Sequence, residues 1–302
     1  MPTEEKKYEV TVIGGSYAGL SASLALGRSL RNVLIIDSGK PCNAQTPHSH
    51  NFITQDGNTP AAIAEKAKAQ VLEYPTVSFR TDRVINVAGS DGDFTVQTES
   101  DGHYRAQKLL FTTGVRDIMP DIPGFAECWG ISVIHCPYCH GYEVREQNTG
   151  ILINGETAYD FARLIRHWTS QLTVFSSGEA TFNKPLVEDL GVSVVEKEIQ
   201  RIVHRQGHIE SLLFSDGSQH PLNALYARPA FQQHCPIPEQ LGCQLTEQGH
   251  IEAGSFQETS VPGVYAAGDN TTFFRAVSIA VAAGTKAGAF INHELIQEVN
   301  YG

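Results

Sequence analysis

Long apolar runs are missing from this sequence, and so is any surplus of basic residues. No stretch approaches the roughly 20 apolar residues needed to span a bilayer, so no membrane-spanning helix is expected. Lys and Arg number 22 against 33 Asp and Glu, a formal net charge of -11. Because a nucleic-acid-binding protein presents a basic face to phosphate, this balance argues against a nucleic-acid partner and against docking on an anionic membrane.

Cysteine is scarce as well, with six in 302 residues, too few for a disulfide scaffold. Residues 1–7 are polar and run directly into an apolar segment, which predicts no signal peptide. The expected compartment is therefore the cytoplasm, where a closely spaced cysteine pair is more often catalytic or metal-binding than structural. A length of 302 residues favours two domains over one.

Two strand–turn–helix–strand patterns predict parallel sheets covered by helices, and hence an α/β fold. The first pattern has strands at 8–13 and 32–37 around a helix at 20–30, and the second has strands at 150–153 and 172–175 around a helix at 156–168. The remaining expected elements are strands at 79–87, 93–98, 108–113 and 263–269 and a long Ala-rich helix at 274–298.

The first pattern carries a glycine-rich turn that is typical of dinucleotide binding. Gly14 would make the tight turn, Gly19 would allow close packing of helix on strand, and Asp37, at the end of the next strand, would accept a hydrogen bond from a ribose hydroxyl. Ser16 stands where the second glycine of the fingerprint is usual. A glycine-rich turn without a ligand is the alternative interpretation.

Two further strand ends complete a pattern that points to one family. Thr113-Gly114 ends one expected strand and Gly268-Asp269 ends another. In this order and spacing the segments resemble the FAD domain of low-molecular-weight thioredoxin reductases, and the resemblance runs over nearly the whole chain. It implies a homodimer and FAD as cofactor, with these contact residues: Gly14, Gly15, Ser16, Ala18, Gly19, Asp37, Ser38, Gln45, Asn51, Val84, Thr113, Gly114, Gly268, Asp269, Ser278 and Ile279.

Segments rich in proline and glycine lie at 119–124 and 228–238 and predict the two points where one domain is inserted into another. With the resemblance, residues 1–116 and 231–302 are expected to form an FAD-binding domain. Residues 117–230 are expected to form an inserted NADPH-like domain that carries a cysteine pair. Both domains would be Rossmann-like.

That pair is Cys136 and Cys139, followed by His140. The two-residue spacing favours a redox-active disulfide, and two buried thiols, a zinc site and c-type haem attachment are the alternatives. Zinc would need further ligands, and no second Cys-x-x-Cys is present; haem attachment normally requires export. No metal site is expected, and His48 and His50 are interpreted as loop histidines.

The resemblance implies roles for the three residues. Cys139 would lie next to the flavin and Cys136 would attack the substrate. His140 replaces the acidic residue of typical thioredoxin reductases and could pass protons at neutral pH; an ordinary histidine at a helix start is the alternative. The motif also resembles that of dithiol oxidases.

The second glycine-rich turn is incomplete. Ile153 replaces its first glycine, Glu156 adds a negative charge, and Ser176 and Ser177 stand where the family has arginines for the 2′-phosphate of NADPH. NADPH is therefore an unlikely cofactor, with NADH or an altered NADPH pose as the alternative. Near the expected flavin ring, Arg275 could supply a positive charge, and a solvated surface arginine is the alternative.

Three functions are consistent with these features. The first is a thioredoxin reductase-like enzyme that passes electrons from FAD through Cys136 and Cys139 to thioredoxin or another disulfide, with a donor such as ferredoxin. The second is an oxygen-dependent oxidase of a small dithiol. The third is a non-catalytic, flavin-bound regulatory protein. Tyr301, near the end of the sequence, could stack over the flavin, and a frayed tail is the alternative.

Overall fold

The protein is described by a computed structural model that covers residues 6–299, so Tyr301 lies outside the described residues. The chain divides into two compact units. The first unit contains the residues up to Ala44, Ala61–Arg116 and the residues from Phe231 on. The second unit contains Gln45–Pro60 and Asp117–Ala230. The mixed α/β architecture expected from the sequence is confirmed.

The first unit is built on a seven-stranded sheet in the order β3-β2-β1-β6-β5-β4, with β17 also pairing with β6. The strands β3, β2, β1, β6 and β17 are parallel, and β5 and β4 join as an antiparallel hairpin. Four consecutive residues of β2 are buried, as expected of a strand covered on both faces. The bounds are β1 Lys6–Ile13, β2 Val33–Asp37, β3 Val77–Thr81, β4 Val84–Ser90, β5 Asp93–Thr98, β6 His103–Phe111 and β17 Val264–Ala266.

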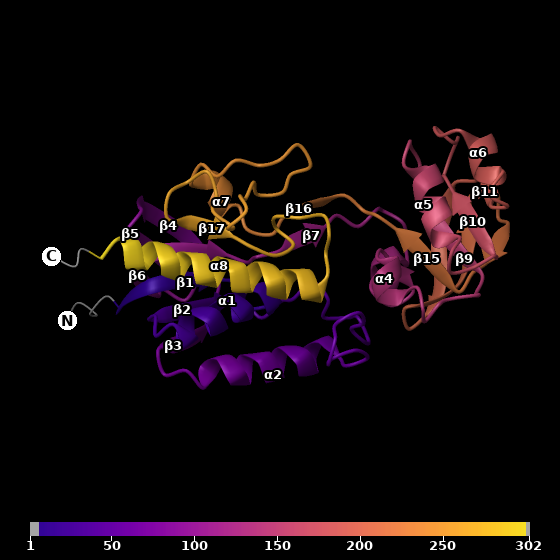
Figure 1. Ribbon diagram of the computed structural model, residues 1–302. Coiled ribbons are helices and arrows are strands. Elements are labelled where there is room, and N and C mark those ends of the chain that lie inside the picture. The colour runs from indigo at the N-terminus through magenta and orange to yellow at the C-terminus, as the bar shows by residue number, and fades with distance from the viewer. Residues whose placement is uncertain (1–5, 300–302) are drawn as a thin grey trace. The chain divides into compact units, whose positions relative to one another are not determined.

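Helices α1 (Tyr17–Arg28) and α8 (Val277–Gln297) run side by side against this sheet (Figure 1). Gly284 and Gly288 are four residues apart and lie on one face of α8. A side chain at either glycine would clash with the backbone of α1, at Ala18 and Ala22 respectively. The two helices can therefore approach so closely only because α8 has no Cβ atom at these positions.

The second unit has a parallel sheet in the order β11-β10-β9-β15-β8 and an antiparallel sheet of β12, β13 and β14. Their bounds are β8 Val133–Ile134, β9 Thr149–Leu152, β10 Leu172–Phe175, β11 Ser193–Val195, β12 Ile199–Arg205, β13 His208–Phe214, β14 Gln219–Pro221 and β15 Ala224–Ala227. The helices of this unit are α3 Phe125–Cys128, α4 Pro137–His140, α5 Ala158–Ile165 and α6 Lys184–Glu188.

Four elements remain: helices α2 (Pro60–Leu72) and α7 (Ile237–Gln240), and the short paired strands β7 (Val115–Asp117) and β16 (Phe231–Gln233). No helix within residues 6–299 combines the length and the apolar character needed to cross a membrane.

Three expectations from the sequence differ from the structure. The single strand expected at 79–87 is two strands, β3 and β4, because Asp82 and Arg83 interrupt it and the chain changes partner from β2 to β5. Helix α2 was not expected, and neither were β8 and the strands β11 to β15 of the second unit. Residues 45–60 were assigned to the first domain but group with the second unit, where Gln45 donates a hydrogen bond to the carbonyl oxygen of Trp129 at 2.6 Å.

Candidate functional site

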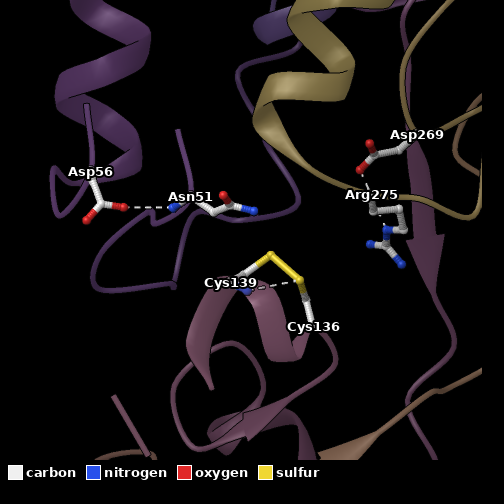
Figure 2. Close-up of a disulfide and its surroundings, with 6 residues drawn as sticks. All are labelled: Asn51, Asp56, Cys136, Cys139, Asp269 and Arg275. Carbon is white, nitrogen blue, oxygen red and sulfur yellow. Dashed lines mark hydrogen bonds and ion pairs between the residues drawn. A yellow bond between two sulfur atoms is a disulfide. The ribbon is translucent and has the colours of Figure 1, made fainter. Parts of the chain in front are cut away.

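Cys136 and Cys139 form a disulfide at the start of α4 in the second unit (Figure 2). Cys136 is the N-cap of this helix, and Pro137 occupies its first turn, where a missing N–H costs nothing. The backbone N–H of Cys139 donates to the sulfur of Cys136 at 3.2 Å. The disulfide interpretation of the pair is therefore confirmed, and both sulfur-bearing residues are partly exposed to solvent.

His140 ends α4 and lies beside a small group of charged side chains. Its ring centre is 6.5 Å from that of His50. His50 is 3.6 Å from a carboxylate oxygen of Glu143 and 3.6 Å from one of Asp56. Burial lowers the pKa of His140; Glu143 acts against this shift and His50 adds to it. His140 is therefore a neutral imidazole at neutral pH and can accept a proton.

The position of α4 is fixed by aromatic packing. The ring of Tyr138 meets that of Trp168 edge-on at 5.7 Å, and a side chain at Gly141 would clash with the Trp168 indole. Tyr138 itself is more than half exposed. An exposed aromatic side chain between the two cysteines offers an apolar contact to a substrate that approaches the disulfide.

Cys128, Cys235 and Cys243 are not part of a disulfide. Burial raises the pKa of Cys128 to about 11 and also raises the pKa of Cys235 and of Cys243. These three are thiols at neutral pH, and a thiol is a poor nucleophile. Within residues 6–299, the side chains that could share a metal ion form one acidic cluster around a lysine, and it contains no cysteine or histidine.

The glycine-rich turn of the first unit has the geometry that the fingerprint predicts. Gly14 has φ +109°, and a side chain there would clash with the carbonyl group of Thr112. A side chain at Gly19 would clash with Gly14, so helix and turn touch backbone to backbone. The N–H of Gly15 donates to a carboxylate oxygen of Asp37 at 2.6 Å, and the other oxygen accepts from Gly39 at 2.7 Å.

Ser16 causes no distortion at this turn. It is the N-cap of α1 in an extended conformation, and its hydroxyl does not cap the helix. The hydroxyl of Thr113 is buried and has no partner among the described residues. An uncommitted hydroxyl beside a glycine-rich turn suits a bound dinucleotide, so these residues fit FAD.

The other predicted flavin contacts of the first unit lie at strand and helix ends. Gly114 and Gly268 have positive φ values of +64° and +96°. Asp269 pairs with Arg275 at 3.6 Å (Figure 2), and the Arg275 side chain is only 14% exposed, so it is not a solvated surface residue. Five more predicted flavin contacts lie in this unit. Ala18 in α1 and Val84 in β4 are buried. Ser38 directly follows β2, and Ser278 and Ile279 lie at the start of α8.

A cavity of about 1170 Å³ lies in the first unit and includes one of these residues, Ser38. It also has three basic side chains, Lys40, Arg83 and Arg116, which the sequence analysis did not select. Arg83 pairs with Glu99, which also lines the cavity. Asp82 and Glu239 line the cavity as well, so its acidic and basic side chains are equal in number and the lining as a whole is not cationic. Lys40 and Arg83 could have been identified in the sequence from their positions shortly after the strands β2 and β3.

Gln45 and Asn51, two more predicted flavin contacts, lie in the second unit. Asn51 has φ +61°, and its N–H donates to a carboxylate oxygen of Asp56 at 2.7 Å (Figure 2). The same Asp56 lies next to His50. The segment is thus organised around the histidine beside α4.

The second glycine-rich turn differs from the first in its side chains and not in how its strand ends. The N–H of Ile153 donates to the carbonyl oxygen of Phe175 at 3.1 Å, as the N–H of Gly14 donates to that of Ile36 at 2.8 Å in the first unit. Gly155 has φ +123° and open space around it, and Glu156 is exposed. Thr157, at the N-cap of α5, makes no capping hydrogen bond with its side chain.

Comparison with known proteins points to a single family. The pyridine nucleotide-disulphide oxidoreductase family matches residues 8–285. The chain belongs to this family. The thioredoxin reductase sirT of Leptosphaeria maculans is 33% identical, with 98% of this chain and 97% of that protein covered.

Two solved structures are similar over nearly their whole length. A putative thioredoxin reductase, TrxB, from Bacillus anthracis has a TM-score of 0.92 and 29% identity, with 96% of this chain and 99% of the other covered. An oxidoreductase from Agrobacterium tumefaciens has a TM-score of 0.91 and 33% identity, with 97% and 100% covered. The protein is thus a flavin-dependent disulfide oxidoreductase of the thioredoxin reductase type, and this membership implies FAD.

Proposed function

We propose that this oxidoreductase exchanges electrons between FAD and the Cys136–Cys139 disulfide without using NADPH, and that the physiological partner of the pair is a disulfide or dithiol on another molecule. The observation that carries the proposal is the disulfide at the start of α4 with a neutral His140 beside it. In the first unit, Gly14, Gly19 and Thr113 would hold FAD, which supplies two-electron chemistry when bound.

The chemistry at the cysteines follows from thiol–disulfide exchange. In the reduced pair, the Cys136 thiolate attacks a substrate disulfide, forming one S–S bond and releasing one substrate thiolate. Cys139 then attacks the mixed disulfide, re-forming the Cys136–Cys139 bond and releasing the second thiolate. His140 holds the proton of the attacking thiol and can return it to the leaving sulfur. The N–H of Cys139 that contacts the Cys136 sulfur stabilises the thiolate.

The lack of NADPH use is supported by the second turn. Ile153 places a β-branched side chain where the fingerprint has its first glycine, and Ser176 and Ser177 carry no positive charge for a 2′-phosphate. An anaerobic titration tests this part: micromolar NADPH should leave the oxidised flavin spectrum unchanged, whereas chemically reduced ferredoxin or a small dithiol should bleach it. Rapid bleaching by micromolar NADPH would contradict the proposal.

Thioredoxin is the first candidate for the partner, because the similar proteins are named thioredoxin reductases. With reduced ferredoxin as donor, the holoenzyme should reduce thioredoxin, and Cys136→Ser should abolish that reduction. A homodimer in the cytoplasm is part of this proposal and rests on the resemblance. Sedimentation velocity of the holoenzyme tests the dimer.

A dithiol oxidase is the second candidate, and His140 favours it. Oxidation of a substrate dithiol needs a base for the first thiol, and burial keeps this imidazole neutral. The electrons would pass from the substrate dithiol through the cysteine pair and the flavin to oxygen. Oxygen uptake on addition of dithiothreitol, absent in Cys136→Ser, would favour this reaction; thioredoxin reduction without oxygen uptake would favour the first. A flavoprotein with neither activity would be the regulatory protein of the third hypothesis.

A further inference from the structure

A cavity of about 500 Å³ lies in the second unit, at the carboxyl ends of β9, β10 and β15. Ligands of α/β proteins bind at this edge of a parallel sheet, and the volume is in the range of small-molecule sites. Most of the lining is apolar, including Ile118, Ile122, Phe125, Leu152 and Ile153. The walls of the cavity are therefore mostly apolar, whereas a dinucleotide would need polar groups there.

Three of the four uncharged polar side chains of the lining are already committed to the protein's own backbone. They are Asn154, Ser176 and Ser177. Each makes at least one hydrogen bond to a main-chain group at 3.2 Å or less. A ligand would gain little from them, because it would have to break these bonds first. Asn154 bonds to main-chain groups of Glu179 and Thr181, Ser176 to one of Gly178, and Ser177 to one of Ile199.

Arg228 is the one cationic side chain of the lining. Its guanidinium group lies 3.8 Å from the centre of the buried Phe161 ring, and it has no ion pair with any carboxylate in residues 6–299. Arg228 is exposed to solvent as a whole, and desolvation of its guanidinium group lowers the pKa of Arg228 without removing its charge. The ring holds the guanidinium in place, so binding an anion would cost little additional side-chain entropy.

We propose that this cavity binds a small molecule with an apolar body and one carboxylate group, and that the carboxylate pairs with Arg228. The apolar walls account for the body, and the single uncommitted cation accounts for the one negative charge. A pyrophosphate is a worse match, since the lining offers its charges a single arginine and has Ile153 where the fingerprint has a glycine. The site is independent of the redox reaction, so it can be tested apart from it.

The test uses the FAD-loaded protein and a matched pair of probes, 4-phenylbutyrate and the uncharged 4-phenylbutanamide, in isothermal titration calorimetry. Arg228→Gln removes the proposed cation. Arg163→Gln is the control, because Arg163 is an exposed arginine of the same unit that also lies near an aromatic ring, Tyr159, but does not line the cavity. Ile153→Glu places a charge on the apolar wall. Thermal midpoints of all variants establish that they are folded.

The parent protein should bind the carboxylate about tenfold more tightly than the amide, as expected for one charge-assisted contact. Arg228→Gln should bind both probes equally, Arg163→Gln should behave as the parent, and Ile153→Glu should lose both. Three results would overturn the proposal: no binding of either probe, an unchanged preference in Arg228→Gln, or displacement of 4-phenylbutyrate by micromolar NADPH.

Discussion

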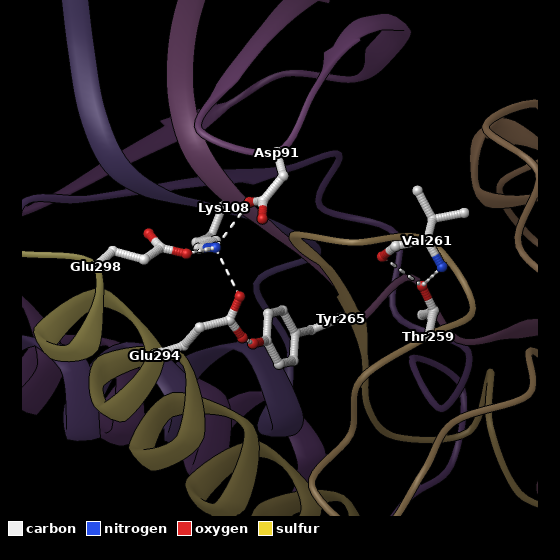
Figure 3. Close-up of polar contacts among 7 residues, drawn as sticks. All are labelled: Asp91, Lys108, Thr259, Val261, Tyr265, Glu294 and Glu298. Carbon is white, nitrogen blue, oxygen red and sulfur yellow. Dashed lines mark hydrogen bonds and ion pairs between the residues drawn. The ribbon is translucent and has the colours of Figure 1, made fainter.

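The ammonium group of Lys108 lies 2.7 Å from a carboxylate oxygen of Glu294, although the two residues are 186 positions apart in sequence (Figure 3). Lys108 is in β6 and is fully buried, and Glu294 is in α8. Asp91 and Glu298 contact the same ammonium group at 2.7 and 2.5 Å. Glu294 also accepts a hydrogen bond from Tyr265 of β17. This group of side chains ties the last helix to the sheet of the first unit.

Replacing Lys108 by Met should lower the free energy of unfolding by about 2–4 kcal/mol, because it leaves three carboxylates without their cation. The partial exposure of those carboxylates keeps the loss below the upper end observed for fully buried pairs. Lys184→Met is the control, since its ion pair with Glu196 is exposed to solvent and should contribute much less to stability. Urea unfolding of the whole protein, followed by circular dichroism, which reports on both units, measures the two variants.

The contribution of Lys108 to the free energy of unfolding should not depend on pH across the neutral range. Burial alone would lower the pKa of Lys108, but the hydrogen bonds with the three carboxylates raise it above the ordinary value. A raised pKa contributes stability that is fully present below the unfolded-state value of about 10.4 and is lost only at higher pH. The difference between the parent and Lys108→Met should therefore be constant from pH 7 to about 9. A difference that falls within this window would contradict the assignment.

Local patterns in the sequence were sufficient for the parallel strands next to the two glycine-rich turns, whereas the parallel strands β8, β11 and β15 were not predicted. The strand at 172–175 has the expected bounds, and all four of its residues, three apolar side chains and Thr173, are buried. The burial of Lys108 could not be foreseen, because its partners come from a turn and from a helix near the other end of the chain. The same holds for His50, whose place beside α4 depends on the fold of a segment without regular structure.

Protonation of His140 should cause the fall of activity at low pH, which is the acid limb of the pH–activity profile. Because burial lowers its pKa, the imidazole is neutral above a pH that lies below the ordinary value of histidine, and activity should fall only below that pH. His140→Gln should reduce the rate of thiol–disulfide exchange by about 10²–10⁴-fold and remove this limb. Stopped-flow measurement of exchange with dithiothreitol between pH 5 and about 8 tests it. An unchanged limb in the variant would show that another group is the base.

His50 and Glu143 should shift that acid limb in opposite directions. Glu143 raises the pKa of His140 and His50 lowers it. Glu143→Gln should therefore move the limb to lower pH, and His50→Gln should move it to higher pH. His48→Gln is the control: its ring lies 6.4 Å from that of His50, but it is not among the groups that shift the pKa of His140. Equal shifts for His48→Gln and His50→Gln would rule out a specific effect of His50.

The two cysteines should give different spectra when they are replaced singly. If Cys139 is the flavin-proximal residue, Cys136→Ser leaves a thiolate beside the oxidised flavin and should show a long-wavelength charge-transfer absorbance. Cys139→Ser should lack that band and should instead trap a mixed disulfide with the substrate through Cys136. Visible spectra and intact mass after incubation with an aromatic disulfide report the two properties. The reverse pattern would exchange the assigned roles.

The glycine-rich turn of the first unit provides a test of the flavin site. Gly14→Ala combines a positive φ with a clash against Thr112, so the turn must move, and the purified protein should contain little or no FAD. Gly92→Ala is the control: it has φ +83° with open space around it and should cost only about 1 kcal/mol of stability, with the FAD content unchanged. The ratio of flavin to protein absorbance measures the content, and a full complement of FAD in Gly14→Ala would show that the flavin binds elsewhere.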